Sequence, residues 1–295
     1  MNPTAQPVAM VGQSSRFNTA TWWQITFLLL VTFWLYLSVL FRLALQWSTD
    51  ANYSHGFLVP IFSGFVLWHD RKRLLELTPK PSSSGLWIMV CGLCLLVLGT
   101  LGSELFLARI SFVVVLVSLI VLIWGWDHLR IALFPLCFLV LMIPLPEIVL
   151  NQITLPLQLV TSRLAAATLP IFGVPVLREG NIINLPSMSL EVADACSGIR
   201  SLFSLITMAV ICGYTIRRRR ALWAVLILAV IPLAIAANTV RIIGAGLLVQ
   251  YWSPDKAEGF FHTFSGWIIF LVSLGLLLSL RQLLTSVGVR TGAHS

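Results

Sequence analysis

Apolar residues in this chain run in long blocks that are separated by short polar segments. A helix needs about 20 predominantly apolar residues to cross the hydrocarbon core of a bilayer. The second block is short and spans only if Tyr53–His55 begin its helix, and the seventh contains Asn238 and Arg241. We predict an all-α integral membrane protein, a polytopic bundle of about eight transmembrane helices. The predicted spans are Ile25–Leu45, Gly56–Trp68, Leu86–Gly102, Ile110–Trp126, Ile131–Leu150, Gly198–Tyr214, Ala221–Tyr251 and Thr263–Leu280.

The basic residues between these blocks predict the orientation of the chain. Cytoplasmic loops of membrane proteins carry an excess of Lys and Arg. Arg71–Arg73 and Lys80 lie between spans two and three, and Arg217–Arg220 lie between spans six and seven. With eight spans, both loops fall on one side, together with the terminal segments 1–24 and 282–295. We therefore predict that both termini are cytoplasmic.

The opposite side then receives four connecting segments. The longest of them is interrupted by prolines and is not predicted to span, although its part Thr154–Thr168 could form a helix along the membrane surface. These outer segments contain most of the ionisable residues that are candidates for function. They are Gln46–His55, Ser103–Arg109, Asn151–Ala195 and Trp252–His262.

Composition agrees with a chain whose main solvent is lipid. Hydrophobic residues make up 58% of the sequence and charged residues only 10%, whereas soluble domains are roughly a quarter charged. The net charge of +8 comes from loop residues that set topology, so it does not indicate a nucleic-acid partner. The five cysteines form neither a zinc motif nor a disulfide framework, and we predict no metal and no cofactor.

One cluster of chemical interest lies at the entrance to the sixth span, where Cys196 follows Glu191 and Asp194. The N-terminus of a helix stabilises a thiolate through its dipole and its unpaired N–H groups. Arg200 follows four residues later, on the same helical face. A buried structural cysteine explains Cys91, Cys94, Cys137 and Cys212 well, because they lie within apolar runs. It explains Cys196 poorly.

A second cluster, Asn238 and Arg241, shares one face of the seventh span. Arg241 lies about 30 Å along the helix from Ala221, near the outer interface. It could simply extend its guanidinium to lipid headgroups. The nearby asparagine on the same face favours a packed polar site instead.

Two weaker clusters lie at the outer starts of spans eight and two. His262 precedes span eight, and a lone histidine there is commonly a cap or an interfacial residue. Asp50 and His55 precede span two and could hold metal or substrate, but a turn that caps a helix explains them nearly as well. Their weight comes from lying on the same predicted side as Cys196 and Arg241.

A thiol, a guanidinium and an imidazole on one face form a set suited to nucleophilic acyl transfer. The thiolate attacks a carbonyl, the imidazole moves protons, and the guanidinium stabilises the oxyanion. This reasoning leaves the substrate open.

The residues also resemble the exosortase/archaeosortase family, from Asp50 to about Gly266. The resemblance implies that 25–281 is an exosortase-like transmembrane domain. The catalytic cysteine of the family falls on Cys196, its arginine on Arg241 and its third residue on His262. Histidine at the third position is typical of the bacterial branch. The segments that carry the resemblance are Ala195–Ser201 (including Ser197), Asn238–Ile242, His262 with Gly266, and Tyr53–Gly56.

The resemblance implies a function as well as a site. Exported proteins with a C-terminal Pro-Glu-Pro signal, an apolar span and a basic tail would be cut on the periplasmic side of the bacterial inner membrane. They could then be transferred to an unidentified acceptor, in a setting that typically includes exopolysaccharide genes. Glu191 and Asp194, if close, would raise the pKa of the Cys196 thiol and oppose thiolate formation.

Two other functions compete with this one. A transporter or channel would also place Asn and Arg near a cavity, but the polar groups gather at one edge and no inverted repeat is visible. A membrane thiol oxidoreductase would rest on Cys91 and Cys94, yet that pair lies inside the third predicted span, away from water.

Overall fold

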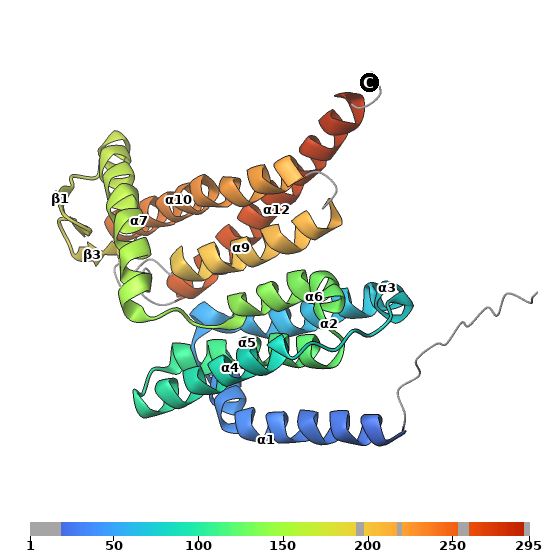
Figure 1. The fold of residues 1–295 in the computed structure, drawn as a ribbon. Coiled ribbons are helices and arrows are strands. Elements are labelled where there is room, and N and C mark those ends of the chain that lie inside the picture. The colour runs from blue at the N-terminus through green and yellow to red at the C-terminus, as the bar shows by residue number, and fades with distance from the viewer. Residues whose placement is uncertain (1–18, 193–197, 217–219, 253–259, 292–295) are drawn as a thin grey trace, which may run out of the picture. The chain divides into compact units, whose positions relative to one another are not determined.

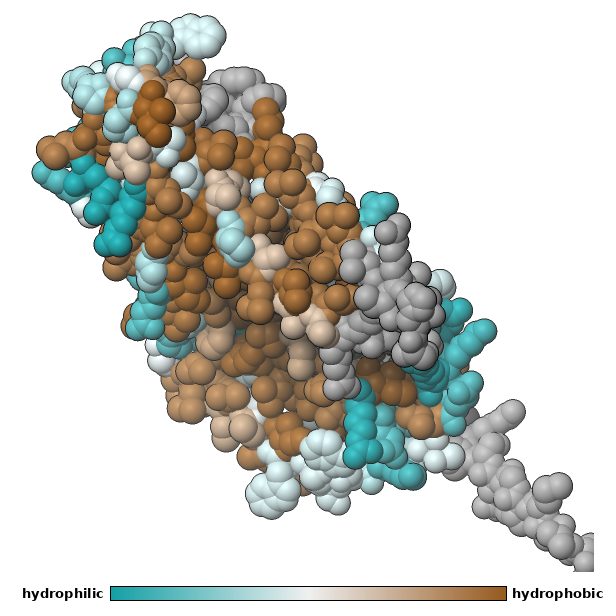
Figure 2. Space-filling model, turned by 90° about the horizontal axis from the view of Figure 1, so that it is seen from above, coloured by the Kyte–Doolittle hydropathy of each residue, from teal (hydrophilic) through white to brown (hydrophobic). Residues whose placement is uncertain are grey.

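The computed structural model describes residues 19–192, 198–216, 220–252 and 260–291, and nearly all of them are helical (Figure 1). Six of the described helices are long and apolar enough to cross a membrane. Large apolar side chains are exposed along them, including Trp34 on the first and Trp267 on the last. The face drawn in Figure 2 is accordingly covered mainly by hydrophobic residues. A surface of this kind is suited to lipid, which confirms the predicted class of membrane protein.

The chain divides into two compact units. Unit 1 comprises the chain up to Leu43 and Ser63–Val140, and unit 2 comprises Ala44–Phe62 and the chain from Leu141 onward. The division therefore falls inside the first two helices, α1 (Thr19–Thr49) and α2 (Leu58–His69).

Unit 1 is built around a hairpin of two long helices. Glycines recur every seven residues on α4, at Gly85, Gly92 and Gly99, and each of them lies against α5. A Cβ atom on Gly99 would come within 2.4 Å of the Ala108 nitrogen, so the two helices touch backbone to backbone. The hairpin consists of α4 (Ser84–Leu101) and α5 (Leu105–Ile123). The unit also contains α3 (Arg71–Glu76) and α6 (Trp126–Leu139).

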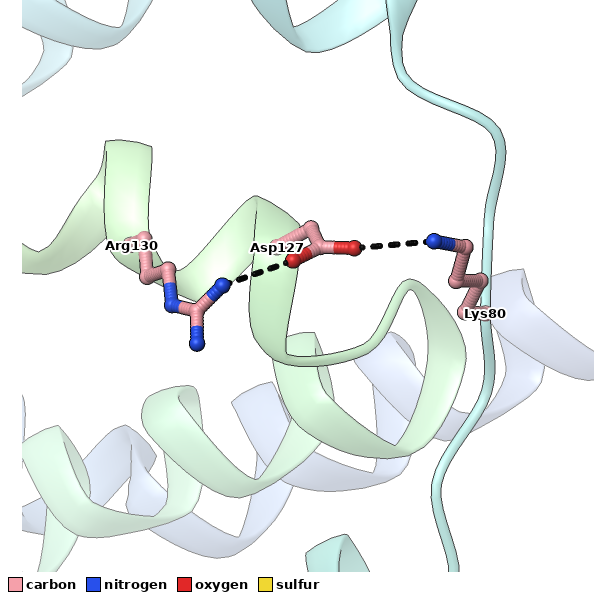
Figure 3. A network of polar contacts seen from close by, with 3 residues as sticks. All are labelled: Lys80, Asp127 and Arg130. Atoms are coloured by element: carbon pink, nitrogen blue, oxygen red, sulfur yellow. Dashed lines mark hydrogen bonds and ion pairs between the residues drawn. The ribbon is translucent and has the colours of Figure 1, made fainter.

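The open end of this hairpin is closed by a loop. Lys80 donates its backbone N–H to the Trp124 carbonyl, and its ammonium lies 3.3 Å from Asp127, which also pairs with Arg130 at 3.0 Å (Figure 3). Gly125 has a positive φ of 90°, and a side chain there would collide with the Lys80 carbonyl. Exposed ion pairs of this kind add little stability, so the loop is held mainly by its backbone hydrogen bonds and close packing.

Unit 2 contains three helices in mutual contact, α9, α10 and α12, and α7 runs across α10 rather than along it (Figure 1). The polar residues Asn238 and Arg241 do not break α10, which is continuous. The described helices are η1 (Ala51–Phe57), η2 (Val140–Met142, whose first residue ends unit 1), α7 (Glu147–Thr168), η3 (Leu169–Phe172), α9 (Gly198–Thr215), α10 (Arg220–Tyr251) and α12 (Phe260–Thr291).

A small cap covers the last turns of α10. It consists of α7, η3 and an antiparallel sheet of three short strands in the order β1-β2-β3. Leu169, Val174 and Ile183 of the cap are fully buried in one apolar cluster with Ile242 and Val249 of α10. This cluster holds the cap to α10 at the end opposite Arg220. The strands are β1 (Leu177–Glu179), β2 (Ile182–Asn184) and β3 (Ser189–Glu191).

The fifth predicted span, Ile131–Leu150, is divided in the structure. Its first part lies in α6 and its last part in α7, with η2 and an irregular segment between them. Pro144 and Pro146 explain the break, because proline lacks an N–H group and disfavours helical geometry in the residue before it. The helix predicted for Thr154–Thr168 begins earlier, at Glu147. It meets the length and apolarity of a span, with the lowest hydropathy of the six.

Candidate functional site

A cavity of about 680 Å³ lies inside unit 2. Its walls come from the end of α1, from η1 and the start of α2, from one face of α9 and from the beginning of α12. Its lining combines hydroxyl groups and an imidazole with large apolar side chains. The lining residues are Trp47, Ser48, Thr49, Ser54, His55, Leu58, Ser201, Ser204, Thr207, Met208, Gly266, Trp267, Phe270 and Leu274.

The wall formed by η1 is held in place by Trp47. The indole of Trp47 is buried and donates a hydrogen bond of 3.0 Å to the Met142 carbonyl. The indole lies against Gly56, where an added Cβ would come within 2.4 Å of its nitrogen, and it packs edge-on against Phe57. Asp50 caps the start of η1 by accepting the Asn52 N–H at 2.9 Å. Capping accounts for the position of Asp50 without a metal or a substrate.

His55 extends from η1 to the α9 side of the cavity. Its ring stacks on Phe203, with ring centroids 6.2 Å apart and planes inclined by 9°. Burial lowers the pKa of His55, while the backbone carbonyl groups of Leu141 and Asn52 oppose this in part. Its Nδ1 atom is buried and makes no hydrogen bond to any residue that the structure describes. His55 therefore borders the cavity with an imidazole whose neutral form is favoured by burial.

Hydroxyl groups from α9 line the same cavity. Ser201, Ser204 and Met208 share one helical face through their i, i+3, i+7 spacing. Thr207 is fully buried, and its hydroxyl has no hydrogen-bond partner within the described part of the chain. A buried polar group without a partner is costly unless a ligand or water satisfies it. The hydroxyl groups on this face of α9 are therefore suited to bind a polar group of a ligand.

Arg241 reaches the neighbourhood of the cavity from α10. It is 6% exposed, and a Cβ atom on Gly266 would lie 4.0 Å from its guanidinium carbon. Gly266 itself lines the cavity from α12. The guanidinium thus lies against the backbone of the cavity wall at a position where no side chain intervenes. Arg241 and Gly266, which belong to separate motifs in the sequence, are therefore neighbours in the structure.

The other predicted site residues are described only in part. Cys196 and Ser197 lie outside the described residues. Arg200 lies in α9 and His262 in α12, but their side chains are not among those described. Asn238 is half-buried on α10, and its side chain is not without a partner. The structure therefore brings His55, Arg241 and Gly266 to one region of unit 2.

Sequence reasoning missed several residues of the cavity, namely Trp47, Ser204, Thr207 and Trp267. The hydroxyls carried a weak signal, because small polar residues on one face of a predicted span are unusual in a lipid-facing helix. The two tryptophans carried none, since tryptophan is common at membrane interfaces.

The remaining cysteines offer no second site among the described residues. Cys91 and Cys94 on α4 and Cys137 on α6 are exposed free thiols, so the burial expected for them is wrong, whereas Cys212 is buried within α9. No group of three His, Cys, Asp or Glu residues suited to a metal occurs in the described parts of the chain.

The transmembrane exosortase family model matches residues 47–279, which is most of the chain and includes every wall of the cavity. The chain belongs to the exosortase family. Membership of this family supports a general role as a membrane protease or transpeptidase that acts on proteins with a sorting signal. Among curated proteins and among solved structures, comparison finds no match.

The extent of this match also bears on the two units. It begins at Trp47, the residue that fixes η1, and ends within α12. It therefore covers most of unit 2, from the end of α1 to within α12, together with the whole α4–α5 hairpin of unit 1. The family match thus covers parts of both units and is not limited to the residues around the cavity.

Proposed function

We propose that this exosortase is a cysteine peptidase or transpeptidase that removes a C-terminal Pro-Glu-Pro sorting signal from exported proteins at the periplasmic face of the inner membrane. Cys196 is the nucleophile, Arg241 stabilises the oxyanion, and His262 transfers protons. Arg200, Asn238, Ser197 and His55 support the site or bind substrate.

The proposed reaction proceeds through a thioester. The Cys196 thiolate attacks the scissile carbonyl carbon, and the negative charge that develops on the carbonyl oxygen is stabilised by the Arg241 guanidinium. The tetrahedral intermediate collapses as the C–N bond breaks, and the protonated His262 gives its proton to the leaving amine. Water or an acceptor nucleophile then attacks the thioester carbonyl carbon and gives up its proton to His262, and the C–S bond breaks to release the Cys196 thiolate beside the protonated His262.

One observation supports this proposal more than any other. Arg241 lies against Gly266 in the wall of a cavity that is also lined by His55 and by Ser201, which ends the segment containing Cys196. Four segments that are far apart in the sequence therefore meet around one space. A guanidinium, an imidazole and several hydroxyls around a cavity form a suitable setting for a peptide bond to be bound and polarised.

The cavity is proposed to bind the peptide beside the scissile bond. Trp267, Phe270 and Leu274 provide an apolar wall from α12, and Ser204 and Thr207 provide hydroxyls from α9. Apolar surfaces with a few placed polar groups are typical of peptide and small-ligand sites. A proline ring of the signal would pack on the apolar wall, while the hydroxyls would bond the neighbouring peptide groups.

The test is co-expression of the enzyme with an exported reporter that ends in a Pro-Glu-Pro signal, followed by mass analysis of the new C-terminus. A free carboxylate identifies hydrolysis, and an added mass identifies transfer. We expect processing to be abolished by Cys196→Ala and largely retained in Cys137→Ala, which serves as the matched control. Processing by Cys196→Ala at a near wild-type rate would refute the nucleophile, and equal loss in Cys91→Ala or Cys94→Ala would favour a redox function instead.

A further inference from the structure

The cavity in unit 2 extends far along the two helices that form its longest walls. On α9 it is lined by a hydroxyl row, Ser201, Ser204 and Thr207, and Thr207 lies about 9 Å further along the helix than Ser201. On α12, which contacts α9, the lining continues from Gly266 to Leu274, about 12 Å along that helix (Figure 1). In the proposed topology, both walls lead from the periplasmic side toward the membrane interior.

The hydroxyl row differs from other hydroxyl residues of the described helices. A threonine inside a helix can donate its hydroxyl to the carbonyl four residues earlier, and Thr32, Thr100 and Thr168 all do so at 2.8 Å. Thr207 makes neither this bond nor another with any described residue. Its side chain is 0% exposed, so bulk water does not compensate for the missing bond. A group that enters the cavity explains why a hydroxyl, and not a methyl group, lies at this depth.

A peptide at this depth meets two opposing requirements. A backbone surrounded by lipid is helical, because its N–H and C=O groups must bond each other. A peptide bond that is attacked by a nucleophile lies in an unwound segment, whose backbone groups then need partners from the enzyme. The hydroxyl row supplies such partners at intervals of about 4.5 Å along α9, and the α12 wall supplies apolar contacts from Phe270 and Leu274.

We propose that the hydroxyl row binds the substrate backbone in an extended form where the sorting signal continues into an apolar segment, with Thr207 as the specificity-determining residue at the inner end. This inference rests on the proposed function, because it assigns the cavity to the same peptide substrate. The enzyme then selects substrates by how readily this segment leaves the helical conformation, in addition to the signal itself.

The experiment measures binding to the full-length Cys196→Ala enzyme in detergent, so that the peptide is not consumed. The probe is a fluorescent synthetic peptide with Pro-Glu-Pro followed by a short apolar segment, and its anisotropy reports binding. We expect the additional change Thr207→Val to weaken binding about five- to tenfold, as the loss of one hydrogen bond implies. The Tm of the free enzyme should rise by about 2–4 °C, because a buried hydroxyl without a partner is removed.

Thr161→Val is the matched control. Thr161 is also a buried threonine of unit 2 whose hydroxyl has no partner within the described part of the chain, but it is not among the residues that line this cavity. It should raise the Tm in the same way and leave peptide binding unchanged. Equal peptide affinity in the Thr207→Val and Thr161→Val enzymes, or a lower Tm for Thr207→Val, overturns the site.

Two isomeric peptides test the extended form. One begins its apolar segment with two isoleucines, which favour extended backbone, and the other with two leucines, which favour a helix. The isoleucine peptide should bind about two- to fourfold more tightly, and equal or tighter binding of the leucine peptide overturns the extended form. Wild-type enzyme that binds both peptides and leaves them uncut contradicts the proposed reaction but supports this site. Cleavage by the wild type together with unaltered binding in Thr207→Val has the opposite meaning.

Discussion

Two arginines are candidate partners of the proposed nucleophile, and they differ in the element that carries them. Arg200 belongs to α9 and follows Cys196 by four residues in the sequence. Arg241 belongs to α10, is buried, and lies against Gly266 of α12 at the cavity wall. An arginine from a different helix is better suited to face the thiol across a bound carbonyl, so Arg241 is the oxyanion partner in the proposed mechanism.

This assignment predicts different effects of lysine at the two positions. Lysine keeps the charge but lacks the planar array of donors. We expect Arg241→Lys to reduce reporter cleavage by roughly 10²–10³-fold, as for a lost oxyanion donor. Arg200→Lys should be milder, with any loss following protein level. The measurement is cleavage normalised to enzyme in membranes, and an inactive Arg200→Lys beside an active Arg241→Lys would reverse the roles.

His55 provides a prediction about pH. Because burial lowers its pKa, the unfolded chain binds a proton more readily than the folded protein. Its contribution to stability is therefore lost as the pH falls below about 6.5, the ordinary histidine pKa, toward the lowered folded value. Between pH 8 and pH 5, the Tm of the wild type should fall more than that of His55→Gln.

At the scale of elements, η1 depends on a close approach that only glycine permits. Gly56 lies against the indole of Trp47, whose hydrogen bond to Met142 ties η1 and the end of α1 to the segment that precedes α7. The motif that contains His55 therefore serves packing as well as chemistry. A larger residue at Gly56 would displace the indole or the helical turn.

We expect Gly56→Ala to lower stability by about 1–3 kcal/mol, the usual cost of overpacking. Reporter cleavage should fall as well, because His55 moves with η1. Gly64→Ala is a matched control, since no atom lies within 4 Å of the added methyl group and alanine favours a helix. Thermal unfolding in detergent measures both variants. If they prove equally stable, the proposed role of the Trp47 contact is wrong.

At the scale of the whole molecule, the proposed topology can be tested without any assumption about chemistry. Residues 69–85 and 215–220 should be cytoplasmic, and residues 151–195 and 252–262 periplasmic. The cap at the far end of α10 from Arg220 agrees with this arrangement within unit 2. Single cysteines labelled with an impermeant maleimide, in a background without native cysteines, test it. Labelling at position 75 in intact cells, or protection at position 180, would contradict the map.

The sequence predicted the long helices well and the short elements poorly. α1, α4, α5, α10 and α12 follow from apolar runs, since each run is long enough to dominate its own conformation. The three strands have three residues each, too few for an alternating pattern to stand out. Pro144 and Pro146 were visible, but the apolar residues around them suggested a continuous span.

The motifs predicted some of the residues that lie around the cavity, but not the cavity itself. The segments around His55 and Arg241 could be recognised, whereas the cavity requires side chains from five separate elements to converge. Nothing in the local sequence of Trp47 or Thr207 indicates that they line the same space. Their positions depend on tertiary packing, which single-sequence patterns do not encode.

The hydroxyl lining of the cavity in unit 2 has a consequence for the competition between hydrolysis and transfer in the proposed reaction. A space of about 680 Å³ has room for roughly 20 water molecules at the volume that each occupies in the liquid. A thioester formed beside such a reservoir would meet a high local concentration of water. Transfer would then require an acceptor that displaces this water when it binds. The fraction of product that carries a free carboxylate would therefore measure how completely the acceptor excludes water from the cavity.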